Sequence, residues 1–229
     1  GSAFRHGAEP AAMTSASSRQ LPEASLARVR ALLGQGAGKR VVLGLVGAPG
    51  AGKSTLASAL QQAFADVSAV LPMDGFHLAN SELRRLGRAG RKGAPDTFDA
   101  AGYLALLQRL RDPARACETV YAPEFRREIE EAVAGAIAIE PHHRLVITEG
   151  NYLLVDQGVW RGVASLLDEC WYVDVDEQLR TDRLVRRHQA FGRTELEAVQ
   201  WAAQTDAPNA ELVASTRVRA DHVFRWSFP

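Results

Sequence analysis

Short apolar runs alternate along the chain with longer stretches in which apolar side chains recur every three or four residues. The short runs are typical of strands buried in a parallel sheet, and the longer pattern is typical of helices with one buried face. Strands are predicted at residues 41–46, 67–71, 144–148, 169–175 and 220–226, with weaker candidates at 118–121 and 136–139. Helices are predicted at residues 21–33, 54–65, 100–110, 159–167, 176–190 and 194–205.

This alternation predicts an α/β protein with a mostly parallel sheet and helices on both faces. The 229 residues suffice for one such domain with a small lid. We assign residues 21–229 to this domain and the lid to residues 176–193. Residues 1–20 lack the pattern and are interpreted as a disordered tail or an expression scar.

Charge and cysteine content limit the possible binding partners and the cellular location. Lysines plus arginines number 27, as do aspartates plus glutamates, so nothing indicates a general affinity for nucleic acid or for an anionic membrane. We expect no membrane segment, since no apolar run approaches the length of a span and the first residues lack the apolar centre of a secretory signal. Cys117 and Cys170 have no metal or redox spacing, which favours a reducing, cytoplasmic location.

The most specific motif is GAPGAGKS at residues 47–54, a G-x-x-x-x-G-K-[ST] loop between a predicted strand and a predicted helix. Its glycines allow the backbone to curve around phosphate oxygens, and the N–H groups of the helix N-terminus face the anion. Lys53 is expected to reach the β- and γ-phosphates, and Ser54 to ligate Mg²⁺. A chance glycine-rich turn is the alternative. The expected nucleotide contacts are Gly47, Ala48, Pro49, Gly50, Ala51, Gly52, Lys53, Ser54 and Thr55.

Two carboxylates follow other predicted strands, Asp74 after the second and Glu149 after the third. Ligands bind at the carboxyl ends of strands in open parallel sheets, so both should lie near Lys53 and Ser54. Phosphoryl transfer needs such a layout, with Asp74 as general base for a substrate hydroxyl and Glu149 near Mg²⁺. An Asp-Gly turn and a loop carboxylate are the alternatives for the two residues.

The segments PMDGFH (72–77), RKGAPDTFD (91–99) and TEGNYLL (148–154), together with GAPGAGKST, resemble the P-loop kinases that include phosphoribulokinase, uridine kinase and the bacterial pantothenate kinases. The resemblance covers residues 20–229 and is greatest to a nucleoside/nucleotide kinase-like branch described as fructose transport system kinases. It implies phosphorylation of a small-molecule hydroxyl by ATP with Mg²⁺, the acceptor being a sugar, a nucleoside or a pantothenate-like compound. A homodimer is compatible with it, since related kinases often dimerise.

The resemblance also implies roles for single residues. Asp74 matches the base of the family, and Glu149 the acidic residue near Mg²⁺. Asn209, within DAPNAEL, resembles a residue near the adenine. The implied substrate contacts are Asp74, His77, Arg91, Lys92, Tyr121, Glu149 and Asn151.

The chain departs from its relatives at VYAPEFRR, residues 120–127. Pro123 stands where pantothenate kinases have a histidine, which disfavours pantothenate as the acceptor. Arg126 stands where the closer branch has an aspartate before an arginine, so no acidic role is expected there.

The predicted lid is rich in arginine. At helical spacing Arg183, Arg186 and Arg187 share a face, on which positive charge would stabilise the transferring phosphoryl group and closure would exclude water. We expect Arg183 to bind the nucleotide and Arg187 to act in catalysis. A solvated helix is the alternative, and His188 is open to a structural role. The lid also contains Arg180 and Arg193.

Other readings are weaker. A nucleotide-binding regulatory protein without small-molecule kinase activity is the alternative function, and a GTPase is disfavoured because an Asn-Lys-x-Asp string is absent. The paired histidines 142 and 143 are interpreted as a loop, without metal-ligand spacing. Core or helix packing is expected for Trp160, Trp171, Trp201 and Trp226.

Overall fold

The computed structural model describes residues 20–226, so the predicted tail lies almost entirely outside the described residues. Five strands form one sheet in the order β2-β5-β1-β6-β7, and every neighbouring pair is parallel. β1 and β5 are buried along their whole length, which is why both appear in the sequence as unbroken apolar runs. The strands are β1 (Val41–Val46), β2 (Ser68–Pro72), β5 (Leu145–Gly150), β6 (Glu169–Asp174) and β7 (His222–Arg225).

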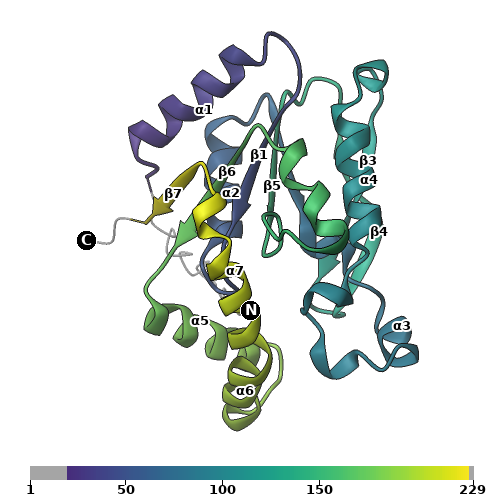
Figure 1. Ribbon diagram of the computed structural model, residues 1–229, viewed down its shortest axis with the longest axis vertical. Coiled ribbons are helices and arrows are strands. Elements are labelled where there is room, and N and C mark those ends of the chain that lie inside the picture. The colour runs from purple at the N-terminus through teal and green to yellow at the C-terminus, as the bar shows by residue number, and fades with distance from the viewer. Residues whose placement is uncertain (1–19, 227–229) are drawn as a thin grey trace, which may run out of the picture.

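Helices cover both faces of the sheet (Figure 1), and alternate residues of β1 contribute to two separate cores. Leu43 and Leu45 pack in one core with α1 (Glu23–Gln35) and α2 (Lys53–Ala63). Val42 and Val46 pack in the other, with α4 (Ala100–Arg111) and the 3₁₀ turn around Trp160. This alternation follows from the two-residue period of a strand.

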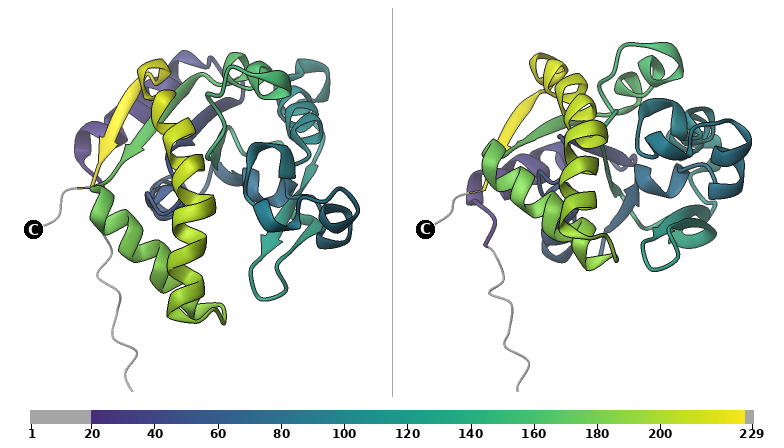
Figure 2. Two further views of the ribbon diagram at one scale, coloured as in Figure 1. Left: turned by 60° about the horizontal axis from the view of Figure 1, so that its bottom comes forward. Right: turned by 90° about the horizontal axis from the view of Figure 1, so that it is seen from below.

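Two further groups of elements flank the edge of the sheet at which β1 and β5 end (Figure 2). One side carries α3 (Asn80–Arg85) and an antiparallel hairpin of β3 (Val120–Arg126) and β4 (Glu131–Ile139). The other side carries α5 (Glu177–Ala190), which follows β6, and then α6 (Glu195–Trp201). A π-helical turn (Ala202–Asp206) joins α6 directly to α7 (Ala207–Ser215).

The α/β class, the parallel sheet and all five main strands are confirmed, with boundaries within two residues. The helix predicted at 159–167 is wrong, because two short 3₁₀ turns lie there, Gly158–Gly162 and Ala164–Leu166. The Trp160 indole donates a hydrogen bond to the Pro95 carbonyl, 3.2 Å away, which fixes the first turn against a neighbouring loop. No helix in the described part of the chain is long and apolar enough to cross a bilayer.

Helix α7 was not among the predicted helices, the last of which ended at residue 205. Proline inside a helix removes one hydrogen bond and clashes with the carbonyl four residues earlier. Pro208 is the second residue of α7 and follows the π-helical turn, so it lies in the first turn of the helix, where proline is tolerated.

Candidate active site

The loop at residues 47–54 forms a cradle between β1 and α2. Gly50 and Gly52 have φ values of 82° and 93°, in the left-handed region where a side chain would be strained. Lys53 is buried, and its ammonium group donates to the carbonyl oxygens of Gly47 at 2.9 Å and Ala48 at 3.2 Å. Burial lowers the pKa of Lys53. The loop therefore places a cation inside a ring of backbone groups at a helix N-terminus, which fits a triphosphate.

The end of β5 reaches this cradle with two polar side chains. Asn151 accepts a hydrogen bond from Lys53 at 2.8 Å, and Glu149 accepts one from the Ser54 hydroxyl at 3.0 Å. Glu149 is buried, and burial together with the negative charge of Asp74 raises its pKa. The Ser54 hydroxyl and the Glu149 carboxylate are hard oxygen donors, which suits Mg²⁺, an ion usually held by few protein ligands.

Asp74 lies in the 3₁₀ turn Met73–Phe76 that follows β2. The Arg127 guanidinium, from the end of the hairpin, approaches its carboxylate to 3.3 Å. Burial alone would raise the pKa of Asp74, but the nearby positive charges of His77 when protonated, Arg127 and Lys53 hold it below its usual value. Asp74 is therefore an ionised carboxylate at neutral pH.

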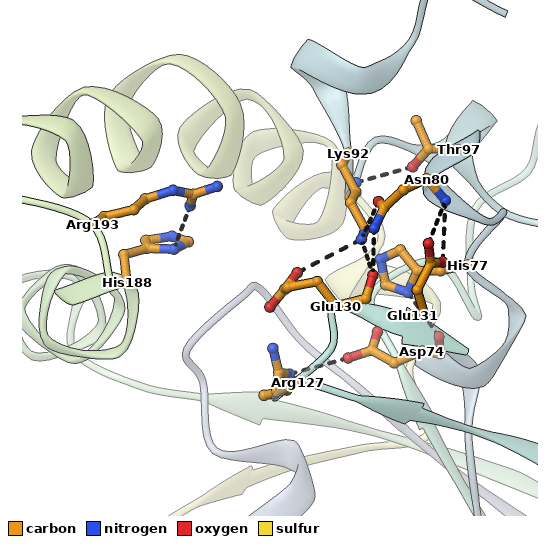
Figure 3. Close-up of polar contacts among 11 residues, drawn as sticks. Asp74, His77, Asn80, Lys92, Thr97, Arg127, Glu130, Glu131, His188 and Arg193 are labelled. Atoms are coloured by element: carbon orange, nitrogen blue, oxygen red, sulfur yellow. Dashed lines mark hydrogen bonds and ion pairs between the residues drawn. The ribbon is translucent and has the colours of Figure 1, made fainter. Parts of the chain in front are cut away.

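The side of the cleft opposite the lid is built from three separate segments, and we call it the hairpin wall (Figure 3). The imidazole of His77 packs between Phe98 and Phe125, with ring centroids 4.1 and 4.6 Å away. Its Nδ1 lies 2.7 Å from the backbone carbonyl of Asp74. The wall consists of His77, Asn80, Lys92, Phe98, Phe125, Arg127 and Glu130.

The lid contributes cations from the other side. Arg183 and Arg187 line the cleft, and burial lowers the pKa of Arg187. Arg186 is exposed outside the cleft lining, and Arg180 is buried beneath the lid, donating to the Pro49 carbonyl at 3.1 Å. Three of the five lid arginines, Arg183, Arg187 and Arg193, thus line the cleft, and Arg180 fixes the base of α5 to the cradle.

His188 joins the lid to the π-helical turn. Its Nε2 lies 2.8 Å from the Asp206 carboxylate, and the Arg193 guanidinium lies 2.8 Å from its Nδ1. Arg193 also stacks over the Trp201 ring, 4.0 Å from the centroid. The structural interpretation of His188 agrees with these contacts. Trp201 differs from the prediction, because it is only partly buried and lines the cleft, whereas the other three tryptophans are buried.

The cradle, the hairpin wall and the lid enclose a single cleft of about 820 Å³. The structure brings most of the predicted site residues to it. Those that line it are Pro49, Gly50, Gly52, Lys53, Ser54, Thr55, Asp74, His77, Lys92, Glu149, Asn151, Arg183, Arg187 and Asn209. Gly47, Ala48 and Ala51 lie behind this lining and shape the loop.

Two predicted substrate contacts lie outside the cleft. Tyr121 is 61% exposed, because its neighbours along β3, Val120 and Ala122, are buried and successive strand residues point to opposite faces. Arg91 is exposed on a 3₁₀ turn and forms a salt bridge with Asp96 at 2.7 Å. Neither residue is part of the cleft lining.

Sequence reasoning missed several cleft residues, above all Arg127. Arg126 pairs with Glu124 at 2.7 Å, whereas the adjacent Arg127 reaches Asp74. The available signal was the pair of arginines after Pro123 and Phe125, in the segment that departs from the relatives. Other lining residues that were not predicted include Asn80, Phe125, Glu130, Trp201 and Asp206.

A parallel sheet that carries a phosphate cradle, two carboxylates at strand ends and an arginine-bearing helix over the same edge defines a P-loop kinase. The model of the phosphoribulokinase/uridine kinase family matches residues 42–225. The chain belongs to this family. Its kinases use ATP with Mg²⁺, in agreement with the fit of the cradle and of the Ser54–Glu149 pair.

Individual relatives agree with this assignment. A Schizosaccharomyces pombe protein provisionally named a uridine kinase is 33% identical over 198 residues, covering 82% of this chain and 83% of that protein. A crystal structure from Silicibacter sp. TM1040, provisionally named a fructose transport system kinase, has 37% identity and a TM-score of 0.73, covering 84% of this chain and 98% of that one. YFH7 of Saccharomyces cerevisiae shares the fold, with 19% identity, a TM-score of 0.72, and coverage of 90% and 98%.

Proposed function

We propose that this kinase transfers the γ-phosphoryl group of ATP to a hydroxyl of a small molecule, with Asp74 as the general base. One observation carries the proposal. An ionised carboxylate, a buried lysine and a Ser–Glu pair line the same cleft, and lid arginines line it from the other side. Phosphoryl transfer requires this combination of positioning and charge.

The nucleotide would be held by the backbone N–H groups of the cradle, by Lys53 and by Arg183. Asn209 would lie near the adenine ring of ATP. Ser54 and Glu149 would hold Mg²⁺, which when bound neutralises charge on the phosphate oxygens. The ammonium of Lys53 is buried, so water screens its charge less than that of an exposed lysine.

Asp74 would accept the proton of the acceptor hydroxyl. Its depressed pKa keeps it ionised at neutral pH, and Arg127 holds one carboxylate oxygen while the other is open to a substrate. Arg187 would place positive charge near the phosphoryl group as it moves, and the lid would shield the reacting atoms from water.

The test is ADP release from ATP with a panel of sugars, nucleosides and pantothenate, in the wild type and in Asp74→Asn. The variant should lose about 10²–10⁴-fold of acceptor-dependent turnover, because the amide cannot take the proton. Its affinity for ATP should stay unchanged in calorimetry. Asp156→Asn is the matched control, since Asp156 is an exposed aspartate paired with Arg161.

Full activity in Asp74→Asn would remove Asp74 from the mechanism. ATP binding without stimulation by any acceptor would instead favour the regulatory, non-kinase alternative.

A further inference from the structure

The hairpin wall contains a lysine whose charge is compensated within the protein. The Lys92 ammonium donates to the Asn80 side-chain oxygen at 2.7 Å and to the backbone carbonyl of Glu130 at 2.6 Å, and the Glu130 carboxylate lies 3.6 Å away. The Glu130 carboxylate compensates the charge of this ammonium group. Lys92 therefore fastens the hairpin to the loop that carries it and contributes no surplus positive charge to the wall.

The other cation of the wall is also compensated. Arg127 pairs with Asp74, and Glu130 lies on the same side of the cleft (Figure 3). A phosphate or carboxylate placed against Arg127 would meet these two carboxylates at close range. Like charges at such separations repel strongly where water is partly excluded.

Positive and negative charges are distributed unevenly between the hairpin wall and the phosphate cradle with its lid. Among the described residues that line it are six lysines and arginines and four carboxylates, a surplus of two positive charges. The hairpin wall with Asp74 contributes two cations and two carboxylates, and Arg193 is balanced by Asp206 through His188. The surplus lies with Lys53, Arg183 and Arg187 against Glu149, where the triphosphate would bind.

The wall presents hydrogen-bond acceptors as well as the donors of Asn80, Lys92 and Arg127. A backbone carbonyl only accepts, so the contact between His77 Nδ1 and the Asp74 carbonyl places the imidazole proton on Nδ1. Nε2 is then an acceptor, and burial lowers the pKa of His77, which keeps the ring neutral. The carboxylates of Asp74 and Glu130 add further acceptors, and all of these atoms suit the O–H groups of a ligand.

We infer that the acceptor is an uncharged polyhydroxy compound, such as a free sugar or the ribose of a nucleoside, and that the charge-balanced hairpin wall selects against acceptors with a phosphate or carboxylate group. The inference rests on the proposed kinase activity and narrows its substrate class. The aromatic rings of Phe98 and Phe125 supply the apolar surface against which the C–H face of such a ligand packs.

The experiment measures ADP release with acceptors in matched pairs at constant ionic strength. The pairs are ribose with ribose 5-phosphate, fructose with fructose 6-phosphate, uridine with uridine monophosphate, and glycerol with glycerate. In any pair that supports turnover, the uncharged member should have the higher kcat/KM, by about tenfold or more. A charged member that equals or exceeds its partner would overturn the inference and leave the kinase function standing. No stimulation by any compound would count against both.

Glu130→Lys tests the cause of the selectivity. Reversing this charge should shift the ratio of kcat/KM toward the charged member of the active pair, by about tenfold. Glu128→Lys makes the same change at an exposed position outside the cleft lining and should leave the ratio unchanged. An unchanged ratio in Glu130→Lys, with ATP kinetics preserved, would show that the charge of the wall does not select the acceptor.

Discussion

The phosphate cradle and the hairpin wall face the same cleft but are held in different ways. In the cradle, Lys53 contacts carbonyl groups only five and six residues away in the sequence. In the wall, Lys92 contacts Glu130 across 38 residues, and Arg127 contacts Asp74 across 53. The cradle is therefore set by local backbone geometry, whereas the wall depends on the packing of the hairpin against the sheet. The difference suits a kinase that keeps one phosphate donor while its acceptor varies among relatives.

Lys53→Met should produce the largest effect, because it removes the charge at the centre of the cradle while nearly filling the same space. We expect kcat/KM for ATP to fall about 10²–10³-fold, with the thermal unfolding temperature close to that of the wild type. ADP release and thermal denaturation measure the two quantities. Lys39→Met, at an exposed position before β1, is the matched control. A loss below about tenfold would contradict the role of the cradle in phosphate binding.

Lys92→Met makes the same substitution in the wall. The substitution removes the hydrogen bond from Lys92 to Asn80 and both contacts from Lys92 to Glu130. The hairpin turn should therefore lose its fixed position in the wall. We expect KM for the acceptor to rise about tenfold, while KM for ATP remains as in the wild type. Steady-state kinetics with each substrate varied in turn separates the two. An equal rise in KM for the acceptor and KM for ATP would mean that the hairpin wall and the cradle are not independent.

Arg127→Gln should have the smallest effect at neutral pH and a characteristic pH dependence. Arg127 helps to hold the pKa of Asp74 below its usual value, so its removal raises that pKa. A general base must be deprotonated, and the acidic limb of the kcat/KM profile should therefore move to higher pH. At pH 7 the loss should stay below about tenfold. Arg127→Lys retains the charge and should keep most of the wild-type profile, whereas an unmoved limb in Arg127→Gln would separate Arg127 from the base.

Much of the fold could be predicted because its strands are buried on both faces. The apolar run Val41–Val46, followed by the cradle, predicts a buried strand. The parallel sheet then brings Asp74 and Glu149 to the same edge. Local sequence was sufficient for the shape of the cradle, since its glycines and the bonds from Lys53 to Gly47 and Ala48 all lie within the loop and the start of α2.

The hairpin wall could not be predicted in the same way. Its cleft residues Arg127 and Glu130 come from a charged segment, and the side to which each points depends on the register of β3 with β4 and on a bulge between Ala122 and Glu124. Tyr121 was misplaced for this reason, because one residue of register moves a side chain to the opposite face. Contacts as distant as that between Asn80 and Glu131 leave no local signal.

The junction of α6, the π-helical turn and α7 has a mechanical consequence. Residues 195–215 form one uninterrupted rod (Figure 2), roughly 30 Å long at the rise of an α-helix. Val213 near its carboxyl end is wholly buried in the core, while Trp201 and Asp206 hold Arg193 and His188 at the mouth of the cleft. The carboxyl end of the rod is fixed in the core. If the rod tilted by about 10° about that end, its amino end would move by about 5 Å. Because α6, the π-helical turn and α7 follow one another without a break, a slight shift beside the sheet would become a displacement the size of a phosphate group at the mouth of the cleft.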